Sequence, residues 1–173
     1  LISTLIVTLD TQWQAQLYFH LARSRFEVIG AVGDAASALT LFRVIRPNLV
    51  IIDTHLPDAE GLALGQLLQS IHPEVKVVLV TGDNPSLQLA ALQNSASGCI
   101  NRNFPLTGWT SLLAYIYEGG AVFNQTVVEK AFTEARSTET ETTILTIGPL
   151  VIDLASRRVT LAGRRVSLTP REF

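Results

Sequence analysis

The feature that most constrains the fold is a regular alternation between short apolar runs and amphipathic stretches over residues 4–120. The apolar runs have the length and turn-residue boundaries of buried strands, and they are Leu5–Leu9, Phe26–Val32, Leu49–Ile52, Val75–Val80 and Gly98–Ile100. Each run is followed by apolar residues at helical spacing, as in Leu64, Leu68 and Ile71. Strands and helices in strict alternation predict an α/β domain built on a doubly wound, five-stranded parallel sheet.

Composition limits the classes of protein to which the chain can belong. Its 173 residues are 47% hydrophobic and 16% charged, which is enough apolar material for a sizeable core. A net charge of -2 gives no general basic character, so any nucleic-acid surface must be local. The single cysteine, Cys99, rules out an internal disulfide, and the apolar runs are too short to cross a bilayer. We therefore expect a cytoplasmic protein without membrane contact.

The alternation of strand and helix patterns ends after residue 120. Asn124 can cap a short helix that runs to about residue 136, and the polar stretch STETETT at 137–143 is typical of a linker. Residues 144–168 then read as short alternating strands of an antiparallel sheet. Thr169–Glu172 forms a capping box, so we expect a helix that begins where the sequence stops. These boundaries predict three segments, residues 1–120, 121–143 and 144–173.

Polar side chains follow four of the predicted parallel strands, namely Asp10, Asp53, Thr81 and Arg102. Because the carboxyl ends of parallel strands meet at one edge of a sheet, we expect these side chains to converge there. Two neighbouring carboxylates suit Mg²⁺, which prefers oxygen ligands and keeps several waters. A hydroxyl and a guanidinium nearby suit a phosphoryl group. The pattern therefore predicts a place where a phosphoryl group can be held on an aspartate.

The same residues resemble a known family. The segment IIDTHLPDAEG, with Asp53, Pro57 and Gly61, is similar to the phosphoacceptor segment of response-regulator receiver domains. VLVTGD, with Thr81, resembles the fourth strand of those domains, and SASGCINRNFP resembles their fifth-strand region. The resemblance covers nearly all of residues 4–120 and implies a flavodoxin-like sheet with strand order 2-1-3-4-5.

The resemblance also implies roles for individual residues. Asp53 would accept a phosphoryl group from the phosphohistidine of a sensor histidine kinase, in an autocatalysed transfer rather than as an enzyme acting on a separate substrate. Asp10, Asp53 and the backbone carbonyl of His55 would hold Mg²⁺. Thr81 would bind a phosphoryl oxygen, and Arg102 would supply positive charge beside it.

Three residues depart from the family pattern. Leu9 stands where the family has one of two adjacent acids, which should weaken Mg²⁺ binding. Arg102 replaces a lysine, and a planar guanidinium is not interchangeable with an ammonium group. Cys99 takes the position of an aromatic residue that moves with the threonine on phosphorylation. Together these changes favour an alternative function, a phosphorylation-independent docking or dimerisation module.

The C-terminal residues carry a second resemblance. LTIGPLVIDLASRRVTLAGRRVSLTPREF is similar to the N-terminal sheet of winged-helix effector domains of the OmpR and PhoB class. In that class a later helix enters the major groove of DNA, and that helix lies beyond the sequence given, so we expect a truncated domain. The resemblance implies a DNA-binding transcriptional regulator, with DNA, a histidine kinase and a second copy of the chain as expected partners.

Simpler interpretations stay open for each candidate. Asp53 could be a turn acid, and Asp10 could cap the helix that begins near Gln12. Thr81 could be an ordinary residue at a strand end, and Arg102 a structural ion-pair partner of a carboxylate.

Overall fold

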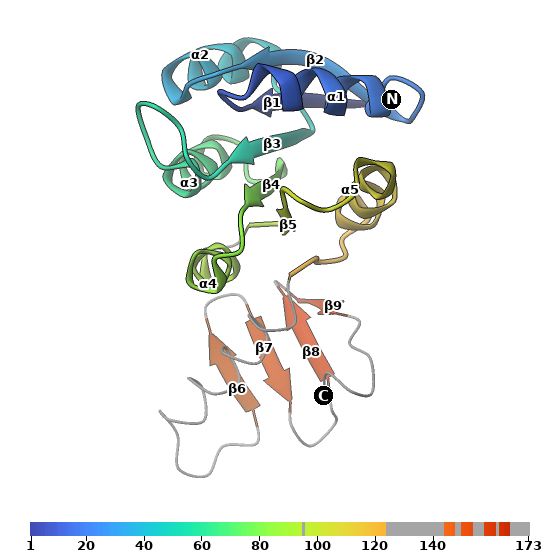
Figure 1. The fold of residues 1–173 in the computed structure, drawn as a ribbon. Coiled ribbons are helices and arrows are strands. Elements are labelled where there is room, and N and C mark those ends of the chain that lie inside the picture. Colours follow the sequence, from blue (N-terminus) through green and yellow to red (C-terminus); the bar gives the residue numbers. More distant parts are fainter. Residues whose placement is uncertain (95, 124–143, 148–149, 154–157, 162, 167–173) are drawn as a thin grey trace.

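A computed structural model describes residues 1–94, 96–123, 144–147, 150–153, 158–161 and 163–166. Residues 1–123 form a parallel β-sheet covered by helices on both faces, and the later residues contribute short strands (Figure 1). Among the described residues, none of the helices combines the length and apolar character that crossing a bilayer needs.

The parallel sheet has five strands in the order β2-β1-β3-β4-β5, as the sequence predicted. The strands are β1 (Ile2–Val7), β2 (Phe26–Val32), β3 (Leu49–Asp53), β4 (Lys76–Thr81) and β5 (Gly98–Asn101). The central strand β3 is almost entirely buried because helices cover both of its faces, which explains its unbroken apolar run. The prediction of a doubly wound, flavodoxin-like sheet is confirmed.

Five α-helices cover the sheet in two layers. They are α1 (Thr11–Leu21), α2 (Ala35–Ile45), α3 (Gly61–Ile71), α4 (Pro85–Gln93) and α5 (Trp109–Tyr117), the last preceded by the short 3-10 helix η1 (Leu106–Gly108). One core joins α1 and α5 to one face of the sheet through Leu17 and Trp109, and a second joins α2, α3 and α4 to the other face through Phe42, Leu68 and Ala91. Successive residues of each strand therefore serve different cores.

Strand boundaries differ from the prediction mainly at the first strand. We predicted Leu5–Leu9, but β1 begins at Ile2 and ends at Val7. Ser3 and Thr4 pair with β2, and the hydroxyl of Thr4 bonds to the Ile2 carbonyl, so polar residues extend the strand backwards. At the other end, Leu9 is 62% exposed and Asp10 caps α1, so the chain has already left the sheet.

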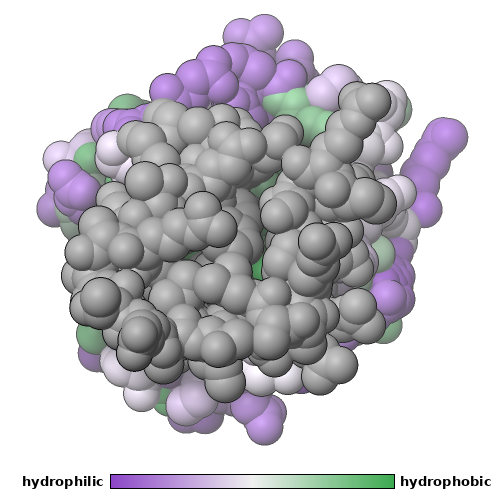
Figure 2. All heavy atoms as spheres, turned by 90° about the horizontal axis from the view of Figure 1, so that it is seen from below, coloured by the Kyte–Doolittle hydropathy of each residue, from purple (hydrophilic) through white to green (hydrophobic). Residues whose placement is uncertain are grey.

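The C-terminal strands form a separate four-stranded antiparallel sheet in the order β6-β7-β8-β9 (Figure 1). These strands are β6 (Ile144–Ile147), β7 (Leu150–Asp153), β8 (Arg158–Leu161) and β9 (Arg164–Val166). The helix expected at 124–136, the linker at 137–143 and the capping box Thr169–Glu172 lie outside the described residues. Seen from the end of the molecule nearest this sheet, the visible described residues are hydrophilic with separate hydrophobic patches among them (Figure 2).

Candidate functional site

Asp53 lies at the carboxyl end of β3, and its side chain is 13% exposed. The chain then turns sharply, because the Gly61 N–H donates to the Thr54 carbonyl over 3.0 Å at the start of α3. A Cβ atom at position 61 would lie 2.1 Å from the backbone carbonyl oxygen of Asp53, so only glycine fits there. The backbone at Gly61 therefore passes close against the backbone of Asp53, and this contact is the steric cause of the spacing between the two residues.

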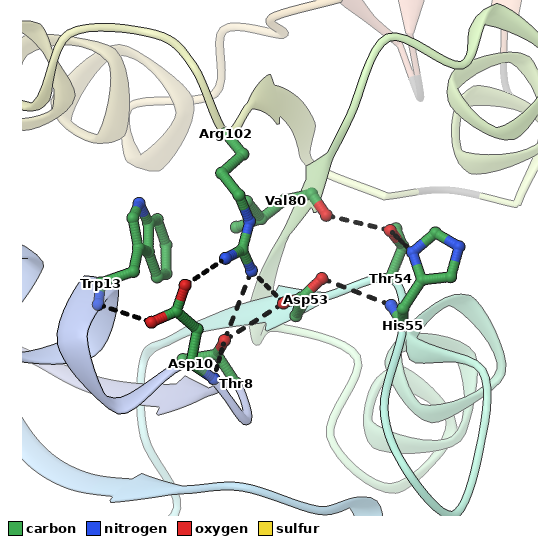
Figure 3. A network of polar contacts seen from close by, with 8 residues as sticks. All are labelled: Thr8, Asp10, Trp13, Asp53, Thr54, His55, Val80 and Arg102. Carbon is green, nitrogen blue, oxygen red and sulfur yellow. Dashed lines mark hydrogen bonds and ion pairs between the residues drawn. The ribbon is translucent and has the colours of Figure 1, made fainter.

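The guanidinium of Arg102 bridges the two acids predicted from the sequence (Figure 3). One terminal nitrogen donates to Asp10 Oδ2 over 2.9 Å, and the other donates to Asp53 Oδ2. Arg102 follows β5, Asp10 follows β1 and Asp53 ends β3, so three strands of the sheet bring the charges together. Charge-assisted bonds of this kind are roughly twice as strong as neutral ones.

Asp10 makes two contacts, and one of them confirms the open alternative that it caps α1. Its Oδ1 atom accepts from the Trp13 backbone N–H over 2.9 Å and so caps α1, while its Oδ2 atom pairs with Arg102. Arg102 is likewise a structural ion-pair partner, as one of the open alternatives proposed. The same geometry leaves its guanidinium beside Asp53, where it could meet a phosphoryl group.

Thr8 and Trp13 complete the site, and the sequence reasoning missed both. The Thr8 hydroxyl donates to Asp53 Oδ2 over 3.1 Å. The indole ring of Trp13 lies against the guanidinium, with 5.1 Å from Arg102 Cζ to the ring centroid. The sequence did contain a signal for Thr8, because this threonine directly follows a buried strand and lies two residues before Asp10. We call the group of Thr8, Asp10, Trp13, Asp53 and Arg102 the Asp53 cluster.

Thr81 lies outside the Asp53 cluster. Its side chain is buried, and its hydroxyl oxygen accepts from Gln88 Nε2 over 3.1 Å and from Cys99 Sγ over 3.6 Å. Asp53 is in register with Val80, and successive residues of a strand point to opposite faces, so Thr81 lies on the face covered by α2, α3 and α4. We call Thr81, Gln88 and Cys99 the Thr81 cluster.

The Thr81 cluster is dry and electrically neutral. Burial raises the pKa of the Cys99 thiol to about 11, and the hydrogen bond to Thr81 opposes that shift only in part. Gln88 is 2% exposed, and its Oε1 atom has no hydrogen-bond partner. Cys99 is thus a buried small residue rather than a nucleophile, in keeping with the absence of a recognisable base in the sequence.

The donor set does not fit the predicted Mg²⁺ site. Both oxygens of Asp10 and both oxygens of Asp53 already accept hydrogen bonds, two of them from Arg102. The Leu9 side chain contributes no oxygen, and the described residues contain no group of three acidic, histidine or cysteine side chains arranged to hold a metal ion. The His55 N–H donates to Asp53 Oδ1 over 3.3 Å, so this turn is held without a cation. A divalent ion between the acids would have to displace a guanidinium.

Sequence comparison gives relatives along most of the chain. The probable transcriptional regulatory protein TcrX of Mycobacterium tuberculosis is 31% identical over 84% of this chain and 56% of its own length. The transcriptional regulatory protein PrrA of Mycobacterium bovis is 30% identical over 98% of this chain and 66% of its own length. The DNA-binding response regulator MtrA of Mycolicibacterium smegmatis is 27% identical over 82% of this chain. The chain spans a little over half to two thirds of the length of these relatives.

Comparison with solved structures gives the same fold. The receiver domain of NarL from Mycobacterium tuberculosis superposes with a TM-score of 0.64 at 21% identity, covering 68% of this chain and 97% of that structure. A LuxR-family two-component response regulator from Aurantimonas has a TM-score of 0.68 at 18% identity, covering 79% of this chain and 98% of that one. The family model of the response regulator receiver domain matches residues 5–113. With that match over more than half of its length, the chain belongs to the response regulator receiver family.

Proposed function

We propose that Asp53 is the phosphoacceptor of a DNA-binding transcriptional response regulator. Receiver domains accept phosphoryl groups rather than act as enzymes on separate substrates, and response regulators work with sensor histidine kinases. The observation that carries the proposal is the position of Asp53, partly exposed at the carboxyl end of the central strand with a guanidinium beside it. In an open α/β sheet this is the edge where ligands bind.

In the proposed transfer, a carboxylate oxygen of Asp53 attacks the phosphorus of a phosphohistidine. A P–O bond to Asp53 forms as the P–N bond breaks, and the leaving imidazole nitrogen keeps the electron pair and takes up a proton from water. Oδ1 is the less engaged oxygen, because only the 3.3 Å bond from His55 holds it. Arg102 offsets the negative charge of the incoming group, which is positioning and electrostatic catalysis.

We further propose that residues 144–173 are the N-terminal part of an OmpR/PhoB-class winged-helix domain, joined to the receiver (1–120) by residues 121–143. The four-stranded antiparallel sheet and the relatives named as transcriptional regulators support this reading. DNA contact would come from a later helix of such a domain. Receiver domains of transcription factors act inside the cell, so the cytoplasm is the proposed location.

A second candidate function is a docking or dimerisation module that works without phosphorylation. The position of Thr81 favours it, because its buried hydroxyl lies on the face of the sheet opposite Asp53 and would have to turn away from Gln88 to donate to a phosphoryl group. Replacement of the usual aromatic residue by Cys99 removes the ring that would follow the threonine. A homodimer is the partner such a module would form most simply.

The two functions are separated by intact-mass measurement after incubation with acetyl phosphate, with and without Mg²⁺. We expect the chain to gain one phosphoryl group, while Asp53→Asn gains none. Asp58→Asn is the matched control, because Asp58 lies in the loop that follows β3 and bonds to the α2 N-terminus instead of to Arg102. It should be phosphorylated like the wild type.

Failure of the wild type to gain mass under either condition would reject Asp53 as a phosphoacceptor and leave the docking module. Gain that persists in Asp53→Asn would place the modification elsewhere. Molar mass in solution, measured with and without the phosphodonor, then tells whether phosphorylation controls dimerisation.

A further inference from the structure

We propose that Arg102 is a built-in cation that takes the place of a divalent metal between Asp10 and Asp53. The inference depends on the proposed function only in taking Asp53 as the centre of the site. Receiver domains typically bind Mg²⁺, whereas three features of this chain favour a guanidinium at that position. They are the geometry of the bridge, the loss of an acid at Leu9 and an aromatic platform for Arg102.

The bridge uses the fixed fork of the guanidinium. Two terminal nitrogens of one planar group reach one carboxylate at the end of β3 and one at the start of α1, and the second nitrogen also lies 3.5 Å from the Thr8 hydroxyl. A lysine ammonium is a single point of charge and would not span the two acids in this way. Arginine at position 102 therefore changes how the site holds its two acids, and it is not a conservative replacement for lysine.

The negative charge of the two acids is balanced better by the guanidinium alone than by the guanidinium together with a divalent ion. Asp10 and Asp53 together carry two negative charges, and Arg102 returns one positive charge. The family's second acid would add a third negative charge, but here Leu9 is apolar and 62% exposed, so that charge is missing. A divalent ion would meet fewer carboxylates and would lie against a guanidinium of like charge.

An aromatic pair holds Arg102 in position. Its guanidinium lies over the ring of Trp13, and Trp13 packs edge-on against Trp109, with ring centroids 5.3 Å apart and planes at 71°. Trp109 is fully buried and donates its indole N–H to the Phe104 carbonyl over 3.2 Å. Stacking on tryptophan is most favourable for a guanidinium. The ring contact therefore stabilises the orientation of Arg102 in which its guanidinium bridges the acids.

Mg²⁺ binding by the full chain tests the inference, measured by isothermal titration calorimetry in the wild type and in Arg102→Gln. Replacing the guanidinium frees two carboxylate oxygens and removes one positive charge. Arg102→Gln should therefore bind Mg²⁺ at least about tenfold more tightly than the wild type. Restoring an acid in the double variant Leu9→Asp, Arg102→Gln should tighten binding further. Arg102→Lys should lie between the wild type and Arg102→Gln.

Arg25→Gln is the matched control. Arg25 also pairs with a carboxylate, Glu118 at 2.7 Å, and lies 5.8 Å from the ring centroid of Phe26, but it is remote from Asp53. Its replacement should leave Mg²⁺ affinity at the wild-type value. Equal affinity in the wild type and Arg102→Gln would overturn the proposal, as would wild-type binding that is lost when Arg102 is removed.

A measurement on the wild type alone decides the matter if Arg102→Gln does not fold. Paramagnetic Mn²⁺ should leave the backbone amide signals of Asp10 and His55 no broader than those of the remote Arg25. Selective broadening at Asp10 and His55 would show a metal between the acids and overturn the proposal. Neither readout involves phosphorylation, so a failed acetyl phosphate reaction and a failed cation test lead to different conclusions.

Discussion

The Asp53 cluster and the Thr81 cluster lie at the ends of neighbouring strands, on opposite faces of one sheet. The first is charged and open: the side chains of Asp10, Asp53 and Arg102 are 45%, 13% and 30% exposed, and every carboxylate oxygen has a donor. The second is neutral and buried, and the Gln88 amide oxygen has no partner. Charge is found where water can reach it, and neutral polar groups are found where it cannot.

This difference shows that a charged site and a buried polar site can lie close together in one sheet with few direct contacts. A backbone hydrogen bond links the two clusters, because the Arg102 N–H donates to the Thr81 carbonyl over 2.7 Å. The Thr81 hydroxyl itself is engaged by Gln88 and Cys99. A change at Asp53 can therefore reach α4 through the Thr81 side chain only if that side chain turns away from Gln88, and a buried amide left without its partner is costly.

Replacing Gly61 by alanine should give the largest loss of stability. The new Cβ would lie 2.1 Å from the Asp53 carbonyl oxygen, so the backbone under the Asp53 cluster would have to move. We expect the free energy of unfolding to fall by about 3 kcal/mol in urea denaturation. Gly82→Ala is the control beside the Thr81 cluster, because no atom lies within 4 Å of its Cβ position. Equal effects at both glycines would mean that the crossing at Asp53 is not tight.

The buried polar pair should respond to side-chain volume more than to the loss of its hydrogen bond. Gln88→Ala leaves a cavity beside Thr81 and should cost about 2 kcal/mol of unfolding free energy. Gln88→Leu fills that space and removes an amide oxygen that has no partner, so it should cost less than about 1 kcal/mol. Thermal and urea unfolding of the two variants measure this. If leucine costs as much as alanine, the bond from Gln88 to Thr81 is the main contribution of the side chain.

Alkaline pH should destabilise the Thr81 cluster through Cys99. Its pKa is raised from 9.0 to about 11 in the folded chain, chiefly by burial. The resulting stability is complete below the unfolded pKa and is lost as pH rises toward the folded value, because the unfolded thiol releases its proton first. At about pH 10 the loss should be roughly 1.4 kcal/mol. Cys99→Ala should lack this component, so parallel pH curves for both proteins would contradict the prediction.

The fold and the charged half of the site could be predicted from the sequence because they depend on coarse periodicity. Alternating apolar runs and helical stretches determine a parallel sheet, and the carboxyl ends of its strands meet at one edge. Asp10, Asp53 and Arg102 needed only to follow their strands to be brought together. An error of two residues in the end of β1 did not change that result.

The location of Thr81 could not be predicted in the same way. Its face depends on the register between β3 and β4, and a shift of one residue moves a side chain to the opposite face. The sequence gives strand ends to within a few residues only. Gln88 was missed for a related reason: a glutamine in an uncharged helix carries no signal that its amide is buried against Thr81.

The smallest predicted effect concerns the loop that follows Asp53, at acid pH. Asp58 accepts from the Ala35 N–H over 2.8 Å and from the Ala36 N–H over 3.0 Å, so it joins the loop after Asp53 to the α2 N-terminus. The bond from Ala35 is the main cause that lowers the Asp58 pKa below 3.8.

A lowered pKa stabilises the fold above its unfolded value, and this contribution is lost as pH falls through the folded value. Asp58→Asn should therefore be slightly less stable than the wild type near neutral pH, and the difference should shrink on acidification below the unfolded pKa. Urea unfolding of both proteins across the acid range measures it. A difference that grows as pH falls would show that another acid holds the loop. The expected result would set the loop after Asp53, which is weakened when Asp58 gains a proton, against the buried Thr81 cluster, which is weakened when Cys99 loses one.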